Sequence, residues 1–134
     1  SKQELKEEFK QTEGNPEIKG KIRNLQRSRA RNRMMQAVPD ADVIIRNPTH
    51  FAVALKYDIH KNNAPILVAK GQDLIALKIV EIAEKNGVTV IENRPLAWRG
   101  ESMRPLDGEI PAEYYGVVAE ILVQVFRKNK KSLE

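Results

Sequence analysis

Short apolar runs after Ala41 predict the strands of a compact domain. Runs rich in β-branched and other apolar residues predict four strands, at residues 42–46, 51–57, 66–69 and 88–91. Apolar residues at helical spacing predict a helix over 72–86, with Asp73 near its start and Gly87 as its C-cap, and a last helix over 111–126. We therefore expect an α/β fold in which helices pack on a small mixed four-stranded sheet.

The order of these elements predicts part of the topology. Residues 66–91 form a strand–helix–strand unit, which favours a parallel strand pair joined by a right-handed crossover. Lys70 and Gly71 are expected to close the first of these strands. Residues 92–108 are irregular and leave room for one short helix, and the basic tail over 127–131 is expected to fray. The last helix should bury the stripe Tyr114, Val117, Val118, Ile121, Leu122 and Val125.

The first part of the chain has a different pattern. Residues 1–38 are highly charged, and Ile18, Ile22 and Leu25 form only a thin apolar stripe. Asn15-Pro16 is typical of a helix start, with Asn as the N-cap and Pro at the first helical position. We predict a long charged N-terminal helical arm over residues 1–38, which ends near Pro39, and a compact domain over residues 39–134.

Composition limits the function classes. A chain of 134 residues with 41% hydrophobic residues suits one compact domain with an extension. The chain has no cysteine, which excludes disulfides and thiolate chemistry and fits a reducing compartment. Its apolar runs fall short of the roughly 18 residues that a membrane span needs. Because the first residue is Ser1, we expect a soluble fragment of a longer protein.

Charge is concentrated in the arm. The net charge is +5, and seven basic residues without an acidic neighbour lie between positions 19 and 33: Lys19, Lys21, Arg23, Arg27, Arg29, Arg31 and Arg33. This run is either a solvated helix face or a surface that attracts anionic lipid or nucleic acid. A basic nucleic-acid-binding module is thus an alternative function. The three Phe and three Tyr form no stacking pair of the kind that an RNA-binding sheet uses.

The pair Asn47-Pro48 carries the candidate chemistry. In most Asn-X pairs the next backbone N–H attacks the Asn side chain and deamidation follows, but proline has no N–H. The remaining route is attack by the Asn47 side-chain nitrogen on its own backbone carbonyl, which forms a succinimide and expels the Pro48 nitrogen. A tight turn between strands would orient this attack, and a proton acceptor and an oxyanion donor would assist it.

Neighbouring residues have both functional and ordinary interpretations. Thr49 either orients the turn or is a surface residue that favours strands, and His50 either accepts the amide proton or is a solvated side chain. His60 is expected to be inert, and Trp98 is either packed or an exposed anchor for a partner. Asn15-Pro16 is an internal comparison, because an isolated Asn-Pro pair is usually a turn or a cap. The two histidines lack metal-ligand spacing with acidic residues, so we expect no metal and no cofactor.

The run Asn47-Pro48-Thr49-His50 resembles the NPTH autocleavage site of the FlhB/YscU family, most closely its flagellar branch. The resemblance covers nearly the whole chain. It also includes Lys19-Gly20-Lys21-Ile22-Arg23, Val68-Ala69-Lys70-Gly71, Leu74-Ile75-Ala76-Leu77, Pro95-Leu96-Ala97, Ile110-Pro111 and Tyr115-Gly116-Val117-Val118-Ala119-Glu120. One stretch departs from the family, because residues 98–105 replace the usual Arg-x-Leu-Tyr of a short helix.

This resemblance implies a self-cleaving regulatory domain of a flagellar type III export gate. The domain would receive export substrates and switch the apparatus from rod and hook subunits to filament subunits. Its site residues would be Asn47, Pro48, Thr49 and His50, and the reaction would be a single-turnover autoproteolysis rather than turnover catalysis. The fragments 1–47 and 48–134 would stay associated, because strand 42–46 remains in the sheet.

The resemblance also implies partners and a location. The parent protein would be embedded in the bacterial inner membrane, with this domain on the cytoplasmic face. Its partners would be export substrates and other export proteins, including gate and hook-length control components, without specific nucleic acid. A conventional hydrolase is a third hypothesis, but no Ser–His–acid set or carboxylate pair can be placed in this sequence.

Overall fold

The computed structural model describes residues 14–48, 50–58, 60–61, 63–97 and 106–129. The chain divides after Arg33 into two units, which are considered separately. The first unit consists of the early turns of helix α2 (Pro16–Ala37). The Asn15 side-chain Oδ1 accepts the N–H groups of Glu17 and Ile18 at 2.9 and 3.4 Å, which confirms the predicted N-cap.

The part of α2 in the first unit presents polar and basic side chains to solvent. The thin apolar stripe is exposed as well, at 45% for Ile22 and 59% for Leu25. This stretch therefore gains little from burial. The last turn of α2 belongs to the second unit, where Met34 is buried and a short 3-10 helix, η1 (Val38–Asp40), leads into the sheet.

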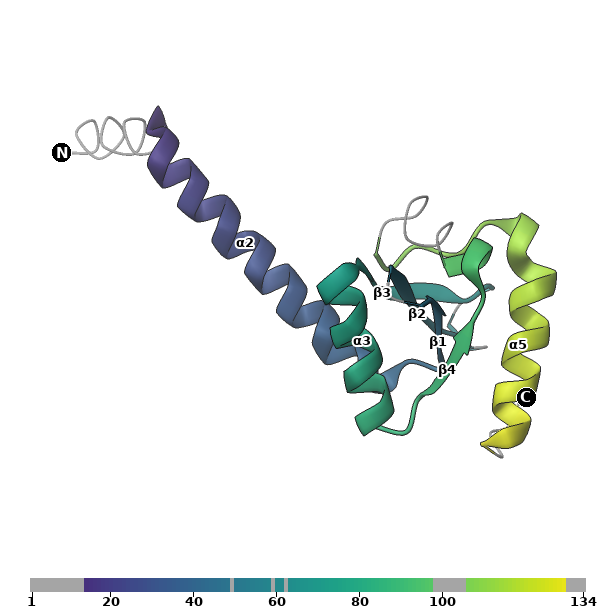
Figure 1. The fold of residues 1–134 in the computed structure, drawn as a ribbon. Helices are drawn as coiled ribbons and strands as arrows, with labels where there is room; N and C mark the ends of the chain where they lie inside the picture. The colour runs from purple at the N-terminus through teal and green to yellow at the C-terminus, as the bar shows by residue number, and fades with distance from the viewer. Residues whose placement is uncertain (1–13, 49, 59, 62, 98–105, 130–134) are drawn as a thin grey trace. The chain divides into compact units, whose positions relative to one another are not determined.

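The second unit is built on a mixed four-stranded sheet, which confirms the predicted fold class. Its strands are β1 (Val43–Asn47), β2 (Phe51–Lys56), β3 (Ile66–Gln72) and β4 (Thr89–Glu92), in the spatial order β3-β2-β1-β4. β1 pairs antiparallel with β2 and parallel with β4, and β2 pairs antiparallel with β3. The two ends of the strand–helix–strand unit, β3 and β4, therefore lie at opposite edges (Figure 1). β3 and β4 run in the same direction, but the predicted pairing between them is wrong, because β1 and β2 lie between them.

β3 is longer than predicted, because it does not close at Lys70-Gly71. Gly71 lies inside the strand, opposite Ala52 of β2. A Cβ at this position would lie 2.3 Å from Cγ2 of Ile75, so the glycine allows the next helix to pack closely on the strand. The predicted turn glycine is therefore a close-packing glycine.

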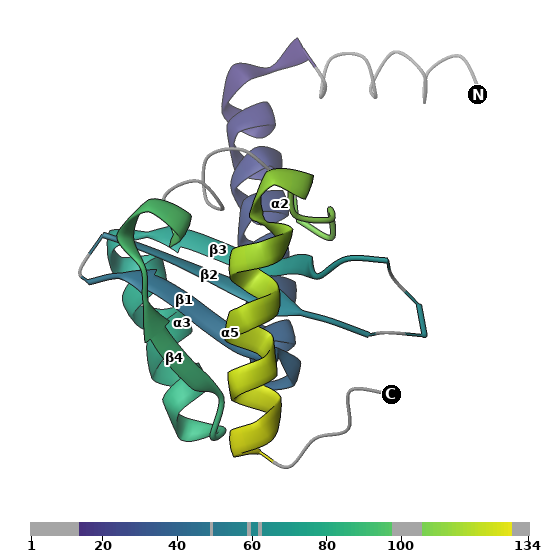
Figure 2. The same ribbon diagram turned by 90° about the vertical axis from the view of Figure 1, so that its right-hand side faces the viewer.

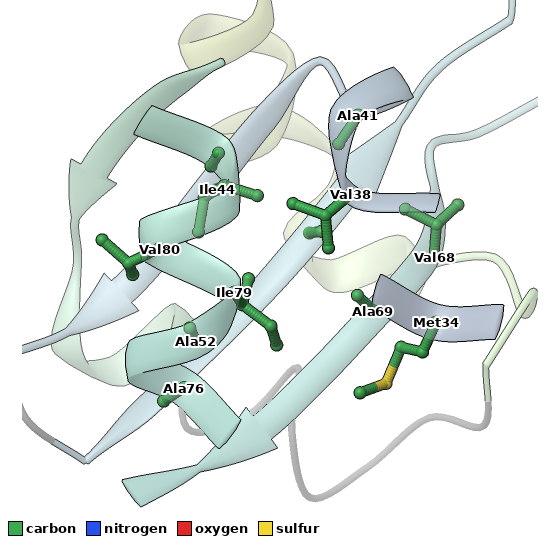
Figure 3. Packing of buried hydrophobic residues seen from close by; sticks show 12 residues of the cluster. Met34, Val38, Ala41, Ile44, Ala52, Val68, Ala69, Ala76, Ile79 and Val80 are labelled. Carbon is green, nitrogen blue, oxygen red and sulfur yellow. The ribbon is translucent and has the colours of Figure 1, made fainter. Parts of the chain in front are cut away.

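Helix α3 (Asp73–Lys85) covers one face of the sheet together with Met34 and Val38 (Figure 3). Its buried face is formed by Ala76, Ile79, Val80 and Ala83, which pack against strand residues such as Ile44 and Ala52. Leu74 and Leu77, two of the apolar residues that recur along this helix, are nevertheless 80% and 52% exposed. Gly87 adopts a φ of 72°, and the N–H of Val88 donates to the Ala83 carbonyl at 2.9 Å, which confirms the predicted glycine cap.

Helix α5 (Tyr115–Lys128) covers the opposite face of the sheet (Figure 2). The predicted helix over 111–126 in fact begins with a 3-10 turn, η2 (Ala112–Tyr114), and continues through Lys128 into the stretch expected to fray. α5 buries Val118, Leu122, Val125 and Phe126, whereas Val117 is 46% exposed. Residues 94–97 are helical and follow an Asn93 side chain that caps the N–H of Leu96 at 3.1 Å, while Trp98 lies outside the described residues.

Candidate functional site

The Asn47-Pro48 pair lies in a tight connection between two strands. β1 ends at Asn47, β2 begins at Phe51, and these two residues are paired in the antiparallel ladder. The backbone N–H of His50 donates to the backbone carbonyl of Asn47 at 3.1 Å and closes a turn. The predicted turn between the two strands is therefore confirmed.

The four predicted site residues have different environments. Asn47 and Pro48 are half-buried, and the His50 side chain is 64% exposed. Thr49 lies outside the described residues, so its role in orienting the turn stays a prediction. The proposed roles of Asn47, Pro48 and His50 stay predictions too, although the turn brings these three residues together as expected.

Buried neighbours fix the position of β1. Val43, Ile44 and Ile45 have no exposed surface, and their side chains alternate between the two faces of the sheet. At the end of the strand, the carbonyl of Arg46 accepts the N–H of Asn93 at 3.0 Å. The Arg46 guanidinium lies 3.6 Å from a carboxylate oxygen of Glu92 on β4. The residue before Asn47 is thus held by the neighbouring parallel strand.

A residue from another element contacts the turn. The backbone N–H of Asp73, at the start of α3, donates to the His50 carbonyl at 2.8 Å. The Asp73 carboxylate oxygen Oδ1 lies 4.0 Å from Nδ1 of His50. In the sequence, Asp73 stands out only as a residue near a helix start. The contact joins segments that are distant in the chain, so no local pattern could have revealed it.

The arrangement around Asn47 matches two needs of an intramolecular attack on its carbonyl. The His50 N–H polarises this carbonyl and is placed to stabilise negative charge on its oxygen. The strands on either side limit the rotation of the backbone at Asn47, which lowers the entropy that orientation requires. In such an attack Pro48 would supply the leaving nitrogen, which has no N–H and so could not compete as a nucleophile.

A second feature is an apolar groove of about 210 Å³ between α5 and the segment that follows β2. Its walls include Leu122 and Phe126 of α5 and Ala64 and Pro65 from the loop before β3. Tyr57, which also lines the groove, donates its backbone N–H to the buried carboxylate of Asp42 at 2.7 Å. The segment before β1 therefore holds one side of the groove in place.

Solved structures resemble the fold. The cytoplasmic domain of FlhB from Shewanella putrefaciens matches with a TM-score of 0.69 and 37% identity, over 78% of this chain and 85% of that one. A C-terminal domain of EscU in which one asparagine is replaced by alanine matches with a TM-score of 0.66 and 27% identity, over 69% of this chain and 92% of that one. Among the described residues, we find no helix with the length and apolar character that crossing a membrane requires.

Curated relatives share more of the sequence. The flagellar biosynthetic protein FlhB of Bacillus subtilis is 52% identical over 98% of this chain, and that of Escherichia coli is 49% identical over 97%. This chain spans 36% and 34% of those proteins, so it corresponds to about a third of their length. The model of the FlhB HrpN YscU SpaS family matches residues 1–125. The chain therefore belongs to the FlhB HrpN YscU SpaS family, as its sequence motifs indicated.

Proposed function

We propose that this domain cuts its own backbone between Asn47 and Pro48 and that the cut regulates a flagellar type III export gate. The observation that carries the proposal is the hairpin turn, in which the Asn47 carbonyl is fixed by the His50 N–H at 3.1 Å. The turn presents a polarised carbonyl to the side chain of the same residue, and it does so between two paired strands.

The reaction begins when the Asn47 side-chain nitrogen attacks the Asn47 carbonyl carbon. A C–N bond forms, a proton leaves the attacking nitrogen, and the His50 N–H stabilises the charge on the oxygen. The bond to Pro48 then breaks, and the Pro48 nitrogen takes up a proton as a new amino terminus. Fragment 1–47 ends in a succinimide, which water opens. The event occurs once per chain, so the domain is autoproteolytic and is not a turnover enzyme.

Solved relatives include variants at an asparagine and at a proline, which is in line with this proposal. Among the similar structures are EscU C-terminal domains in which an asparagine is replaced by alanine or aspartate, and one in which a proline is replaced by alanine. These are the two residue types that flank the proposed cut. Variants of this kind are what a test of an Asn-Pro cut would use.

The position of β1 supports the proposal that the two fragments stay associated. β1 lies between β2 and β4, and its residues Val43 to Ile45 are fully buried. After a cut at residue 47, fragment 1–47 would still supply this inner strand. Separation would expose both faces of the sheet and break two ladders, which makes it costly.

Membership of the export family supports a role in which the domain receives export substrates on the cytoplasmic face of the inner membrane. We place the docking of an apolar segment of an export substrate at the groove beside Leu122 and Phe126, because it is a concave apolar surface along helix α5. The change from rod and hook subunits to filament subunits would follow the cut. Gate and hook-length control components are the expected further partners.

The alternative, a nucleic-acid-binding module, has one observation in its favour, the exposed basic side chains of α2. Such a helix binds any polyanion weakly and with strong salt dependence. A gel shift in moderate salt should therefore show no specific complex. The relatives named above are flagellar biosynthetic proteins, which favours the flagellar function.

Mass spectrometry of the denatured chain tests the cut directly. After incubation under native conditions, the intact 15.2 kDa chain should be replaced by fragments 1–47 and 48–134. Asn47→Ala should stay intact with an unchanged fold, and the matched variant Asn15→Ala should be cut at the wild-type rate. An intact wild-type chain, or an Asn47→Ala chain that still splits at this bond, would contradict the proposal.

A further inference from the structure

Asp73 contacts the cleavage turn in two ways, although it belongs to a different element. Its backbone N–H donates to the His50 carbonyl at 2.8 Å, and its Oδ1 lies 4.0 Å from His50 Nδ1. The N–H of the same His50 holds the Asn47 carbonyl at 3.1 Å. Asp73 therefore contacts the residue whose N–H holds the carbonyl of the bond that the proposed reaction breaks.

The backbone of Asp73 has an uncommon conformation. Its φ is 50°, in the left-handed region, while the preceding Gln72 is extended with φ −117° and ψ 153°. This bend carries the chain sharply from β3 into α3 and aims the Asp73 N–H at the turn. Such a conformation costs on the order of 1 kcal/mol in a residue with a side chain, and glycine would adopt it without strain. What Asp adds to this position is therefore its carboxylate.

We propose that Asp73 is a positioning residue for the self-cleavage reaction and that it acts through His50. This inference rests on the proposed cut at Asn47-Pro48. The Asp73 carboxylate attracts the Nδ1–H of His50, which favours the tautomer with a free Nε2. Nε2 can then accept the proton of the attacking Asn47 nitrogen and return it to the departing Pro48 nitrogen. The carboxylate keeps its charge throughout, so protons and electrons balance.

The exposure of the pair limits the size of the effect. The side chains of His50 and Asp73 are 64% and 76% exposed, and exposed pairs of this kind contribute little to folding stability. Their contribution should therefore appear in the rate of the cut rather than in the melting temperature. We expect a loss of about threefold to tenfold in rate, which is less than the roughly hundredfold or more that a directly placed acid–base group supplies, because Asp73 acts through His50.

The test is a time course of fragment 48–134 appearing in freshly translated chain. Asp73→Asn and Asp73→Gly both tolerate a positive φ and keep the backbone N–H, so they remove only the carboxylate. Both should slow the cut by about threefold to tenfold. Asp73→Glu, which keeps a carboxylate, should lie closer to the wild-type rate than Asp73→Asn. Glu84→Gln removes a negative charge from an exposed position of the same helix and should leave the rate unchanged.

A double-mutant cycle separates positioning from a purely structural role. Asp73→Asn should slow the cut in the wild-type chain and have no further effect in a His50→Ala chain. An equal slowing in both backgrounds would overturn the inference, because Asp73 would then act without the imidazole. A wild-type rate for Asp73→Asn would overturn it as well.

The tautomer of the ring gives a second readout. In the Asn47→Ala chain, which should stay intact, the ¹⁵N shifts of the His50 ring should change when Asp73→Asn is added. Unchanged shifts would overturn the inference. Cleavage of the Asn47→Ala chain would instead refute the proposed function itself, so the two failures are distinguishable.

Discussion

The dipeptide Asn-Pro occurs twice in this chain, and the two copies are held in different ways. At Asn15 the side-chain oxygen accepts the N–H groups of Glu17 and Ile18, and the backbone carbonyl accepts the N–H of Lys19 at 3.0 Å. Both the side chain and the backbone carbonyl of Asn15 are therefore engaged at the start of α2. Its side chain is directed toward the following helical turn, where it satisfies backbone donors.

Asn47 is held by strands rather than by a helix. Its carbonyl accepts the backbone N–H of His50, and the residue is paired across the hairpin with Phe51. Fully buried strand residues precede it, whereas the surroundings of Asn15 are exposed. Both Asn-Pro pairs therefore contain the side-chain amide and the backbone carbonyl that cyclisation requires. We propose that the β1–β2 hairpin makes only the Asn47-Pro48 pair reactive.

Among changes that keep Asn47, the largest expected effect on the rate of the cut comes from replacing Pro48, the leaving residue. Pro48→Ala introduces an N–H that can attack the Asn47 side chain, so deamidation should begin to compete with the cut. We expect the cut to slow by about tenfold, which corresponds to about 1.4 kcal/mol of activation free energy. Intact-mass and fragment measurements over time would follow both products. Pro16→Ala changes the other copy and should leave the cut unaffected; cleavage of Pro48→Ala at the wild-type rate would show that proline is not needed.

The next effect concerns β1, the buried strand that ends at Asn47. Ile44 of β1 has no exposed surface and belongs to the buried cluster under α3, so Ile44→Ala should lower the free energy of unfolding by about 2–5 kcal/mol. The same change should promote separation of fragments 1–47 and 48–134 after the cut. Chemical denaturation of the Asn47→Ala chain and gel filtration of the cut chain measure the two effects.

A matched change near the first copy should have little effect. Ile22 is 45% exposed in α2, so Ile22→Ala removes little buried surface. It should change the free energy of unfolding by less than about 0.5 kcal/mol and should not promote separation of the fragments. Equal destabilisation by Ile22→Ala and Ile44→Ala would contradict the view that buried residues support Asn47-Pro48 but not Asn15-Pro16.

A smaller effect is expected from the strand that supports the hairpin. Gly71→Ala would place a Cβ 2.3 Å from Ile75, so α3 must shift away from β3, at a cost of about 1–3 kcal/mol. Gly116 lies in α5 with no heavy atom within 4 Å of the corresponding Cβ, so Gly116→Ala should be neutral or slightly stabilising. Thermal unfolding of both variants in the uncut background would measure the difference, and equal melting temperatures would refute the close-packing role of Gly71.

Sequence analysis predicted the local features of the molecule well. The apolar run Val43 to Ile45, the turn at Asn47, the Asn15 cap and the Gly87 cap each depend on neighbours in the chain, and all are present in the structure. The family resemblance and the fold class are confirmed by the comparisons. The reactive roles of the site residues stay predictions, because they concern a reaction rather than a conformation.

The failures of sequence analysis were non-local. Local periodicity does not state which strands are neighbours, so it could not place β4 beside β1 instead of β3. Leu74 follows the helical period but is 80% exposed, because the packed face of α3 is set by small residues such as Ala76 that the pattern undervalued. Asp73 looked like a helix start, and only the tertiary fold brings it to His50.

The smallest expected effect gives the sharpest form of the comparison. Glu17→Thr combined with Ile18→His writes the full tetrapeptide Asn-Pro-Thr-His at the start of α2, where no hairpin surrounds it. We expect no new cut after Asn15, because the Asn15 side chain should still cap the helix through the backbone N–H groups of positions 17 and 18, whose donors the substitutions keep. Mass spectrometry would detect a fragment 1–15 at the level of a few per cent. Its appearance would mean that the tetrapeptide suffices for the reaction and that the strands around Asn47 contribute only to holding the fragments together.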